Sequence, residues 1–119
     1  MSCETTFERD LHVVHDRAEL GGVFTALCER LASDLRRKDY LGRNIGIKLK
    51  FDNFRTITRG TTIAQPTADA TEIRRVAGQC LKRAPLDRRL RLLGVRVGSL
   101  VRRSDLAATA PVATTLDLF

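Results

Sequence analysis

The sequence predicts an α+β domain in which strands and helices follow one another in the order βαββαβ. Three observations lead to this prediction. Two apolar stripes with helical spacing each follow a capping signal, two strand-like segments lie between them, and a further strand-like segment lies near each end. This order favours a single four-stranded, mostly antiparallel sheet that carries both helices on one face and leaves the other face open. The length of 119 residues suits one domain of this kind.

The first strand and the first helix are expected in the N-terminal third of the chain. Residues 2–7 (SCETTF) favour extended structure because they contain two threonines and a phenylalanine. Asp16 followed by Glu19 resembles a capping box, and apolar residues at steps of three and four predict a helix that runs to about Asp39. We expect Gly42 to mark the turn that leaves this helix.

A strand with a basic outer face is expected next. Apolar and polar residues alternate cleanly over residues 44–51, so the apolar side chains share one face of the strand. Lys48 and Lys50 fall on the other face. Because both helices are expected to cover the apolar face, these two lysines should lie on the open face of the sheet.

The next strand should form a hairpin with the one before it. Asp52-Asn53 is typical of a tight turn, and residues 54–63 favour extended structure. Gly60 is expected to introduce a bulge, and Pro66 is expected to end the strand. The alternation does not decide which face each side chain of residues 54–60 occupies.

The second helix is expected to begin at another capping box and to be followed by the last strand. Asp69 and Glu72 have the spacing of the box, and Pro85 stops the helix. Residues 90–100 favour a strand in which Arg91 and Arg96 have opposite parity. A bulge near Leu93-Gly94 is expected to turn both arginines outward.

The charge of the chain is concentrated in its middle. Lys and Arg number 21 against 14 Asp and Glu, which gives a net charge of +7 and a pI near 10.2. Residues 42–103 hold 15 of the basic residues and only 4 of the acidic ones. Such a surface favours a polyanion as partner, and nucleic acid is the commonest large one. A membrane surface is less favoured, because much of the charge lies in strand-like segments rather than on an amphipathic helix.

Several other classes of protein are excluded by simple patterns. No apolar run approaches the roughly 20 residues that span a bilayer. The N-terminus is acidic and polar, unlike a secretory signal. Three cysteines are an odd and sparse set, which favours a reducing, cytoplasmic setting over a disulfide framework.

The residues do not assemble a recognisable catalytic or metal site. No glycine-rich phosphate loop is present, and the carboxylates of the basic segment fall at expected turns and caps. Four residues of the N-terminal part have side chains that can bind zinc, but their spacing matches no short metal knuckle. They are Cys3, His12, His15 and Cys28. We therefore predict a non-enzymatic chain without a metal or cofactor of its own.

The supply of base-reading side chains is also poor. The chain has five Phe, one Tyr and no Trp, and the phenylalanines read as core or strand-end residues rather than as a stacking platform. Lys, Arg, Thr and backbone N–H groups remain, and these bind phosphates without reading sequence. We predict a binder of the duplex backbone that is indifferent to sequence and sensitive to salt.

Three stretches of this sequence carry a resemblance to a known family. They are ETTFERDL, IGIKLKFDNFRTITRGTTI and RLRLLGVRVGSL, and their order and spacing match over residues 2–100. The chain resembles the C-terminal little finger domain of Y-family translesion DNA polymerases, most closely the bacterial DNA polymerase IV type. The resemblance implies a parent polymerase that uses magnesium in a separate catalytic core and that synthesises DNA past damage with low fidelity. The fragment itself is not expected to polymerise DNA.

The resemblance also implies which residues contact duplex DNA. The residues implied by the family are Thr6, Thr58, Arg59, Gly60, Arg91 and Arg96. Alternation and charge add Lys48, Lys50 and Arg55. All are expected on the open sheet face, where they would hold template and primer backbones.

The chain is expected to divide into a folded domain over residues 1–103 and a flexible tail over residues 104–119. The tail ends in TLDLF, which is similar to the peptide by which bacterial polymerases bind the sliding clamp. Leu116, Leu118 and Phe119 match that peptide, whereas a threonine stands where glutamine is usual. The expected partners are therefore duplex DNA, the clamp and the catalytic core, and no membrane is expected as a partner. The expected location is the cytoplasm, at the nucleoid.

Two other functions remain open. An RNA-binding or translational-regulator domain could share the same order of strands and helices, and it would prefer single strands. A protein-docking module would associate through an apolar patch, without sensitivity to salt.

Overall fold

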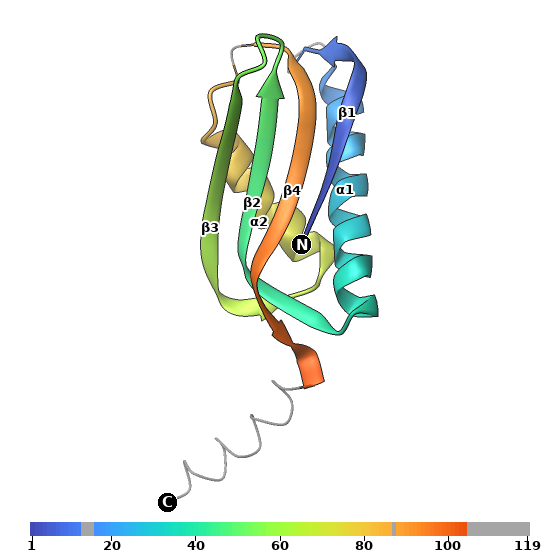
Figure 1. Ribbon diagram of the computed structural model, residues 1–119, viewed down its shortest axis with the longest axis vertical. Coiled ribbons are helices and arrows are strands. Elements are labelled where there is room, and N and C mark those ends of the chain that lie inside the picture. Colours follow the sequence, from blue (N-terminus) through green and yellow to red (C-terminus); the bar gives the residue numbers. More distant parts are fainter. Residues whose placement is uncertain (13–15, 87, 105–119) are drawn as a thin grey trace, which may run out of the picture.

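The computed structural model describes residues 1–12, 16–86 and 88–104, and it has the predicted βαββαβ order (Figure 1). The elements are β1 (Ser2–Leu11), α1 (Arg17–Arg37), β2 (Tyr40–Phe51), β3 (Thr56–Thr67), α2 (Ala70–Lys82) and β4 (Leu90–Arg102). The predicted fold class is confirmed. The strands are longer than expected at several ends, and β1 in particular continues beyond the predicted end at Phe7.

The four strands form one antiparallel sheet in the order β1-β4-β2-β3. The first and last strands of the chain therefore pair, and β4 lies in the middle beside β2. Both helices cover the same face of this sheet (Figure 1). Helix α1 packs mainly on β1 and β4, whereas α2 packs on β2 and β3. No helix of the described residues lies over the opposite face.

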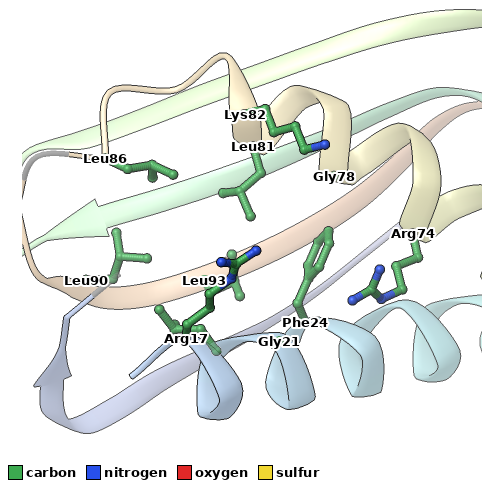
Figure 2. Close-up of a pocket in the computed structure, with 11 residues that line it drawn as sticks. Arg17, Gly21, Phe24, Arg74, Gly78, Leu81, Lys82, Leu86, Leu90 and Leu93 are labelled. Atoms are coloured by element: carbon green, nitrogen blue, oxygen red, sulfur yellow. The ribbon is translucent and has the colours of Figure 1, made fainter. Parts of the chain in front are cut away.

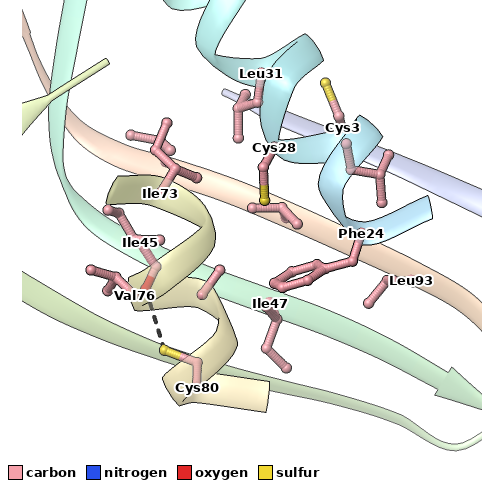
Figure 3. Packing of buried hydrophobic residues seen from close by; sticks show 14 of the residues in the cluster. Cys3, Phe24, Cys28, Leu31, Ile45, Ile47, Ile73, Val76, Cys80 and Leu93 are labelled. Carbon is pink, nitrogen blue, oxygen red and sulfur yellow. Dashed lines mark hydrogen bonds between the residues drawn. The ribbon is translucent and has the colours of Figure 1, made fainter. Parts of the chain in front are cut away.

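The core lies between the sheet and the two helices (Figure 3). Alternate residues of β2 and β4 point into it, among them Ile45, Ile47 and Leu93, each no more than 1% exposed. Burial of such a side chain stabilises the fold by about 1.5–3 kcal/mol. Cys28 and Cys80 lie here too, and Cys80 Sγ approaches the carbonyl O of Ile45 at 3.7 Å.

The two helix starts are capped differently. The Asp69 carboxylate accepts a hydrogen bond from the Glu72 N–H at 3.1 Å, which is one half of the predicted capping box. The other half does not form, because the Asp69 N–H donates to Thr67 Oγ1 and the Glu72 carboxylate accepts from Arg75. Asp16 also occupies the N-cap position, but its side chain makes no cap bond to helix α1. Its Oδ2 instead accepts from the His12 backbone N–H at 2.7 Å. The capping box predicted at Asp16 is therefore wrong, because the carboxylate binds the chain that precedes the helix.

The turn that leaves α1 is made by Asp39 and not by Gly42. Asp39 has a φ of 61°, the left-handed conformation that usually follows a helix. Gly42 lies within β2, opposite Leu100 of β4. A side chain at Gly42 would overlap Val97 and lie 2.9 Å from the carbonyl O of Gly98. The prediction was wrong because this glycine serves close packing within the sheet.

The irregularity in β3 lies beyond Gly60. Pairing between β2 and β3 is regular from Thr56 to Thr62, with Gly60 opposite Gly46, and the register shifts only between Thr62 and Thr67. Pro66 lies inside β3 instead of ending it. Pro66 is tolerated because β3 is an edge strand, where a proline breaks no hydrogen bond to a further strand. Gly60 forms no bulge, because it serves the regular pairing with Gly46 across the two strands.

The bulge in β4 falls at Arg91 and not at Leu93-Gly94. Lys50 pairs with Leu92 while Phe51 pairs with Leu90, so Arg91 is the extra residue between them. From Leu92 onward β4 is in regular register with β2. The bulge thus resets the orientation of Arg91 alone, and Arg96 points away from the core by simple alternation.

Candidate nucleic-acid interface

The helix-free side of the sheet is here called the open face. Successive side chains of a strand point to opposite faces, so the open face is formed by the residues that alternate with the core-facing ones. Cross-strand pairing places its side chains in rows that run across the four strands. The open face comprises Ser2, Glu4, Thr6, Asn44, Gly46, Lys48, Lys50, Thr56, Thr58, Gly60, Thr62, Leu92, Gly94, Arg96 and Gly98.

One row joins a cation to an acid across a glycine. Thr58, Lys48, Gly94 and Glu4 are successive cross-strand partners on β3, β2, β4 and β1. Lys48 Nζ lies 3.6 Å from Glu4 Oε2, and both side chains are about half exposed, at 45% and 48%. In water such a pair contributes only about 0–1 kcal/mol, so a phosphate can compete for the lysine.

A second row leaves backbone bare beside an arginine. Gly60 and Gly46 face each other on β3 and β2, and Arg96 follows on β4. A side chain at Gly46 would lie 2.7 Å from the carbonyl O of Arg59, so only glycine fits there. Among the described residues no carboxylate forms an ion pair with Arg96, which is exposed. Gly46 is itself buried, whereas Gly60 is exposed, so the row offers the Arg96 guanidinium together with accessible backbone at Gly60.

A third cluster lies at the hairpin end of the open face. Lys50 Nζ lies 5.3 Å from the centroid of the Phe54 ring, and Arg91 Cζ lies 4.3 Å from it. Arg91 Nη1 also lies 3.6 Å from Asp10 Oδ1. The bulge in β4 thus brings Arg91 beside Lys50 although the two residues are not cross-strand partners. Arg55 follows in the hairpin and is exposed.

The structure brings most of the predicted site residues together. Six of them lie on the open face: Thr6, Lys48, Lys50, Thr58, Gly60 and Arg96. Arg91 joins them through the bulge, and Arg55 lies at the hairpin end. Arg59 is the exception, because it pairs with core-facing Ile47 and so has helix-side parity on the edge strand. Contact of these residues with DNA stays a prediction.

One residue of the site differs from what the sequence indicates. The pattern favours a core or strand-end place for Phe54, yet it is 60% exposed. Its position directly after the Asp52-Asn53 turn was the available signal. The predicted clamp-binding residues Leu116, Leu118 and Phe119, and all of the tail beyond residue 104, lie outside the described residues.

The three thiols lie away from the open face, and burial favours the protonated form of two of them, Cys3 and Cys28. Burial raises the pKa of Cys28 from its ordinary value of 9.0 to about 11. The pKa of Cys3 is also raised, first by burial and then by the nearby Asp34 carboxylate. Within the described part of the chain, no three His, Cys, Asp or Glu side chains come together to hold a metal ion.

The helix side carries a separate apolar groove of about 470 Å³ (Figure 2). It lies between α1, α2 and β4, and its floor includes Phe24 and Leu93. Arg74 stands at its rim, where its Nε donates to Thr25 Oγ1 at 2.7 Å. The groove is separated from the open face by the thickness of the sheet.

None of the described helices is both long enough and apolar enough to cross a bilayer.

The order of the elements and the helix-free basic face define an α+β domain with one open, positively charged sheet face. The chain belongs to the impB/mucB/samB family: the model of the C-terminal domain of that family matches residues 1–109. The predicted resemblance to the little finger domain of DNA polymerase IV is thereby confirmed.

The chain is similar to DNA polymerases of both bacteria and animals. It is 36% identical over 110 residues to human DNA polymerase kappa, and the aligned region covers 88% of this chain but 12% of that one. It is 34% identical over 112 residues to DNA polymerase IV of Streptomyces coelicolor, with 92% of this chain and 23% of that one covered. The chain therefore spans a quarter or less of the length of these relatives.

Solved structures show the same fold. A little finger domain of PolIV, solved in a complex with the beta-clamp processivity factor, is 26% identical with a TM-score of 0.64. The match covers 81% of this chain and 84% of that domain. A Dbh DNA polymerase in an insertion ternary complex is 12% identical with a TM-score of 0.59, over 85% of this chain and 28% of that one. This second likeness concerns the fold alone.

Proposed function

We propose that this domain binds the sugar–phosphate backbone of primer–template duplex DNA through its open face. The observation that carries the proposal is the gathering of Lys48, Lys50, Arg91 and Arg96 on the one side of the sheet that no helix covers. Each cation that neutralises a phosphate releases a counterion, so binding falls as salt rises.

Binding of this kind is indifferent to sequence. Lysine, arginine and threonine side chains donate to phosphate oxygens, which are the same at every base pair. The exposed backbone at Gly60 allows a phosphate to approach this part of the sheet closely. No aromatic ring stands in the middle of the open face, which disfavours stacking on splayed single-stranded bases.

The parent of this domain is, on this proposal, an error-prone DNA polymerase that copies damaged templates. The domain would hold the duplex against a separate catalytic core, which carries the magnesium chemistry. On this proposal the magnesium site lies in that core and not in this domain. The polymerase would act in the cytoplasm at the nucleoid.

The sliding clamp is the second proposed partner. The similar PolIV domain was solved together with the beta clamp. The tail of this chain supplies Leu116, Leu118 and Phe119, an apolar set suited to a groove on another protein. A tether of this kind raises the local concentration of the polymerase on DNA that carries the clamp. Deleting residues 115–119 should abolish clamp binding in a pull-down while duplex binding persists.

Titration of a generic duplex against salt tests the proposal. For the wild type, log Kd should rise with log salt concentration with a slope of roughly 2–4, about 0.9 for each phosphate neutralised. The variant Lys48→Ala/Lys50→Ala/Arg91→Ala should lose at least about tenfold in affinity and most of the slope.

A matched variant controls for the loss of charge itself. Arg30, Arg75 and Lys82 are exposed on the two helices, and replacing all three by alanine removes the same charge from the covered side of the sheet. This control should bind DNA within about threefold of the wild type. A salt-independent affinity, or equal losses in both triple variants, would overturn the proposal. Tighter binding of single strands than of duplex would favour the RNA-binding alternative.

A further inference from the structure

Phe54 combines a backbone conformation that is unusual for phenylalanine with a side chain that is unusually exposed. Its φ is 66°, in the left-handed region that favours glycine or asparagine. Its side chain is 60% exposed and takes no part in the core or in the apolar layer around it. Strained and exposed residues that serve neither turn nor core are candidates for a functional role.

The hairpin itself does not require a phenylalanine. The Phe51 N–H donates to the carbonyl O of Arg55, and the Phe54 N–H donates to the carbonyl O of Phe51, both at 2.9 Å. The loop therefore has three residues, and the last one of such a loop adopts the left-handed conformation. Glycine would take this place with less strain.

The Phe54 ring contacts two cations that come from different strands. Arg91 Cζ lies 4.3 Å from the ring centroid and Lys50 Nζ lies 5.3 Å from it. Both cationic side chains are only partly exposed. Two like charges at one ring repel each other, and the negative face of an aromatic ring offsets this repulsion. Asp10 approaches Arg91 as well, at 3.6 Å.

We propose that Phe54 is a positioning residue of the DNA interface: its ring holds Lys50 and Arg91 together as a two-cation clamp for a backbone phosphate. The inference rests on the proposed function and adds a part to it. Long basic side chains lose much rotamer freedom when they bind. A ring that already orders two of them reduces this loss, and the gain in affinity offsets the strain at the turn.

The test compares folding and DNA binding in Phe54→Gly. Because glycine suits the left-handed turn, the melting temperature should stay the same or rise. Affinity for a generic duplex should fall about five- to tenfold at low salt, because two long side chains would lose the order that the ring gives them before binding. Phe54→Tyr keeps the ring and should bind within about twofold of the wild type.

Two more variants separate positioning from other roles. Phe54→Leu keeps an apolar side chain without the aromatic face, and it should weaken binding almost as much as glycine does. In the background Lys50→Ala/Arg91→Ala, Phe54→Gly should cause no further loss, because the cations on which the ring acts are gone.

The contrary outcomes are distinct. Wild-type affinity in Phe54→Gly or Phe54→Leu overturns the inference. The proposed function then still stands if the triple alanine variant of Lys48, Lys50 and Arg91 loses binding. An equal loss on Phe54→Gly in the background without both cations also overturns it, because the ring would then contact DNA directly. Unchanged binding in every variant would remove the proposed function itself.

Discussion

The Lys48 ammonium reaches the Glu4 carboxylate, 3.6 Å away, across the bare backbone of Gly94. The three residues lie in one row on strands β2, β4 and β1, so the absence of a side chain on β4 lets the outer two meet. Glu4 is the single acid among the residues that define the open face. It therefore competes with any phosphate for Lys48.

Removal of the Glu4 charge should strengthen DNA binding. In Glu4→Gln, the affinity for a generic duplex should rise about two- to fivefold at low salt, and the gain should shrink as salt increases. The free energy of unfolding should change by less than about 1 kcal/mol, because the pair is exposed. Fluorescence anisotropy at two salt concentrations and denaturant unfolding measure the two effects.

Glu29→Gln is the matched control, since Glu29 is exposed on α1 and its loss changes the net charge equally. It should alter DNA affinity by less than about twofold. Weaker binding in Glu4→Gln than in the wild type would show that the glutamate supports the interface instead of competing with the phosphate.

The two glycines that face each other on β2 and β3, Gly46 and Gly60, should differ in how well the fold tolerates alanine. In Gly46→Ala, the new Cβ would lie 2.7 Å from the carbonyl O of Arg59, so the two strands must move apart. We expect a loss of about 1–3 kcal/mol in the free energy of unfolding. In Gly60→Ala, the nearest atom would lie 3.5 Å away, and the fold should tolerate the change. Denaturant unfolding of both variants should show this contrast, and equal losses would contradict the close approach at Gly46.

Exposed glycine in a helix gives a prediction of opposite sign. Gly22 lies within α1, and a Cβ added there would meet no atom within 4 Å. Gly22→Ala should therefore stabilise the domain by roughly 1 kcal/mol, because alanine restricts the unfolded chain and favours the helix. Thermal unfolding would detect a rise of several degrees, about 4–8 °C for a domain of this size. An unchanged or lower melting temperature would indicate that the helix needs glycine at this place.

The sequence predicted those features that depend on near neighbours. The cap at Asp69 is a bond to Glu72, three residues away, and its spacing was visible in the sequence. The faces of Lys48 and Lys50 followed from strict alternation with a buried set, since a strand has a period of two. These short-range rules sufficed to place the centre of the candidate interface.

Features that depend on pairing between distant strands escaped prediction. Gly42 and Gly60 both read as turn or bulge signals, yet what each faces across the sheet decides its role. The bulge at Arg91 is set by the simultaneous pairing of β4 with β1 and β2. The exposure of Phe54 follows from the hairpin closing over three residues, which composition alone does not show.

The buried thiol of Cys28 predicts a loss of stability at alkaline pH. Burial raises its pKa from 9.0 to about 11 in the folded chain, so the folded state holds its proton where the unfolded chain has lost it. This stabilisation is complete below pH 9 and disappears as the pH rises to 11, a change of about 2–3 kcal/mol. Guanidinium unfolding at pH 8 and at pH 11 measures it. In Cys28→Ala, which retains Cys3 and Cys80, the loss of unfolding free energy between pH 8 and pH 11 should be smaller than in the wild type by about 2–3 kcal/mol. Equal losses in the two proteins would show that other groups govern the alkaline limit.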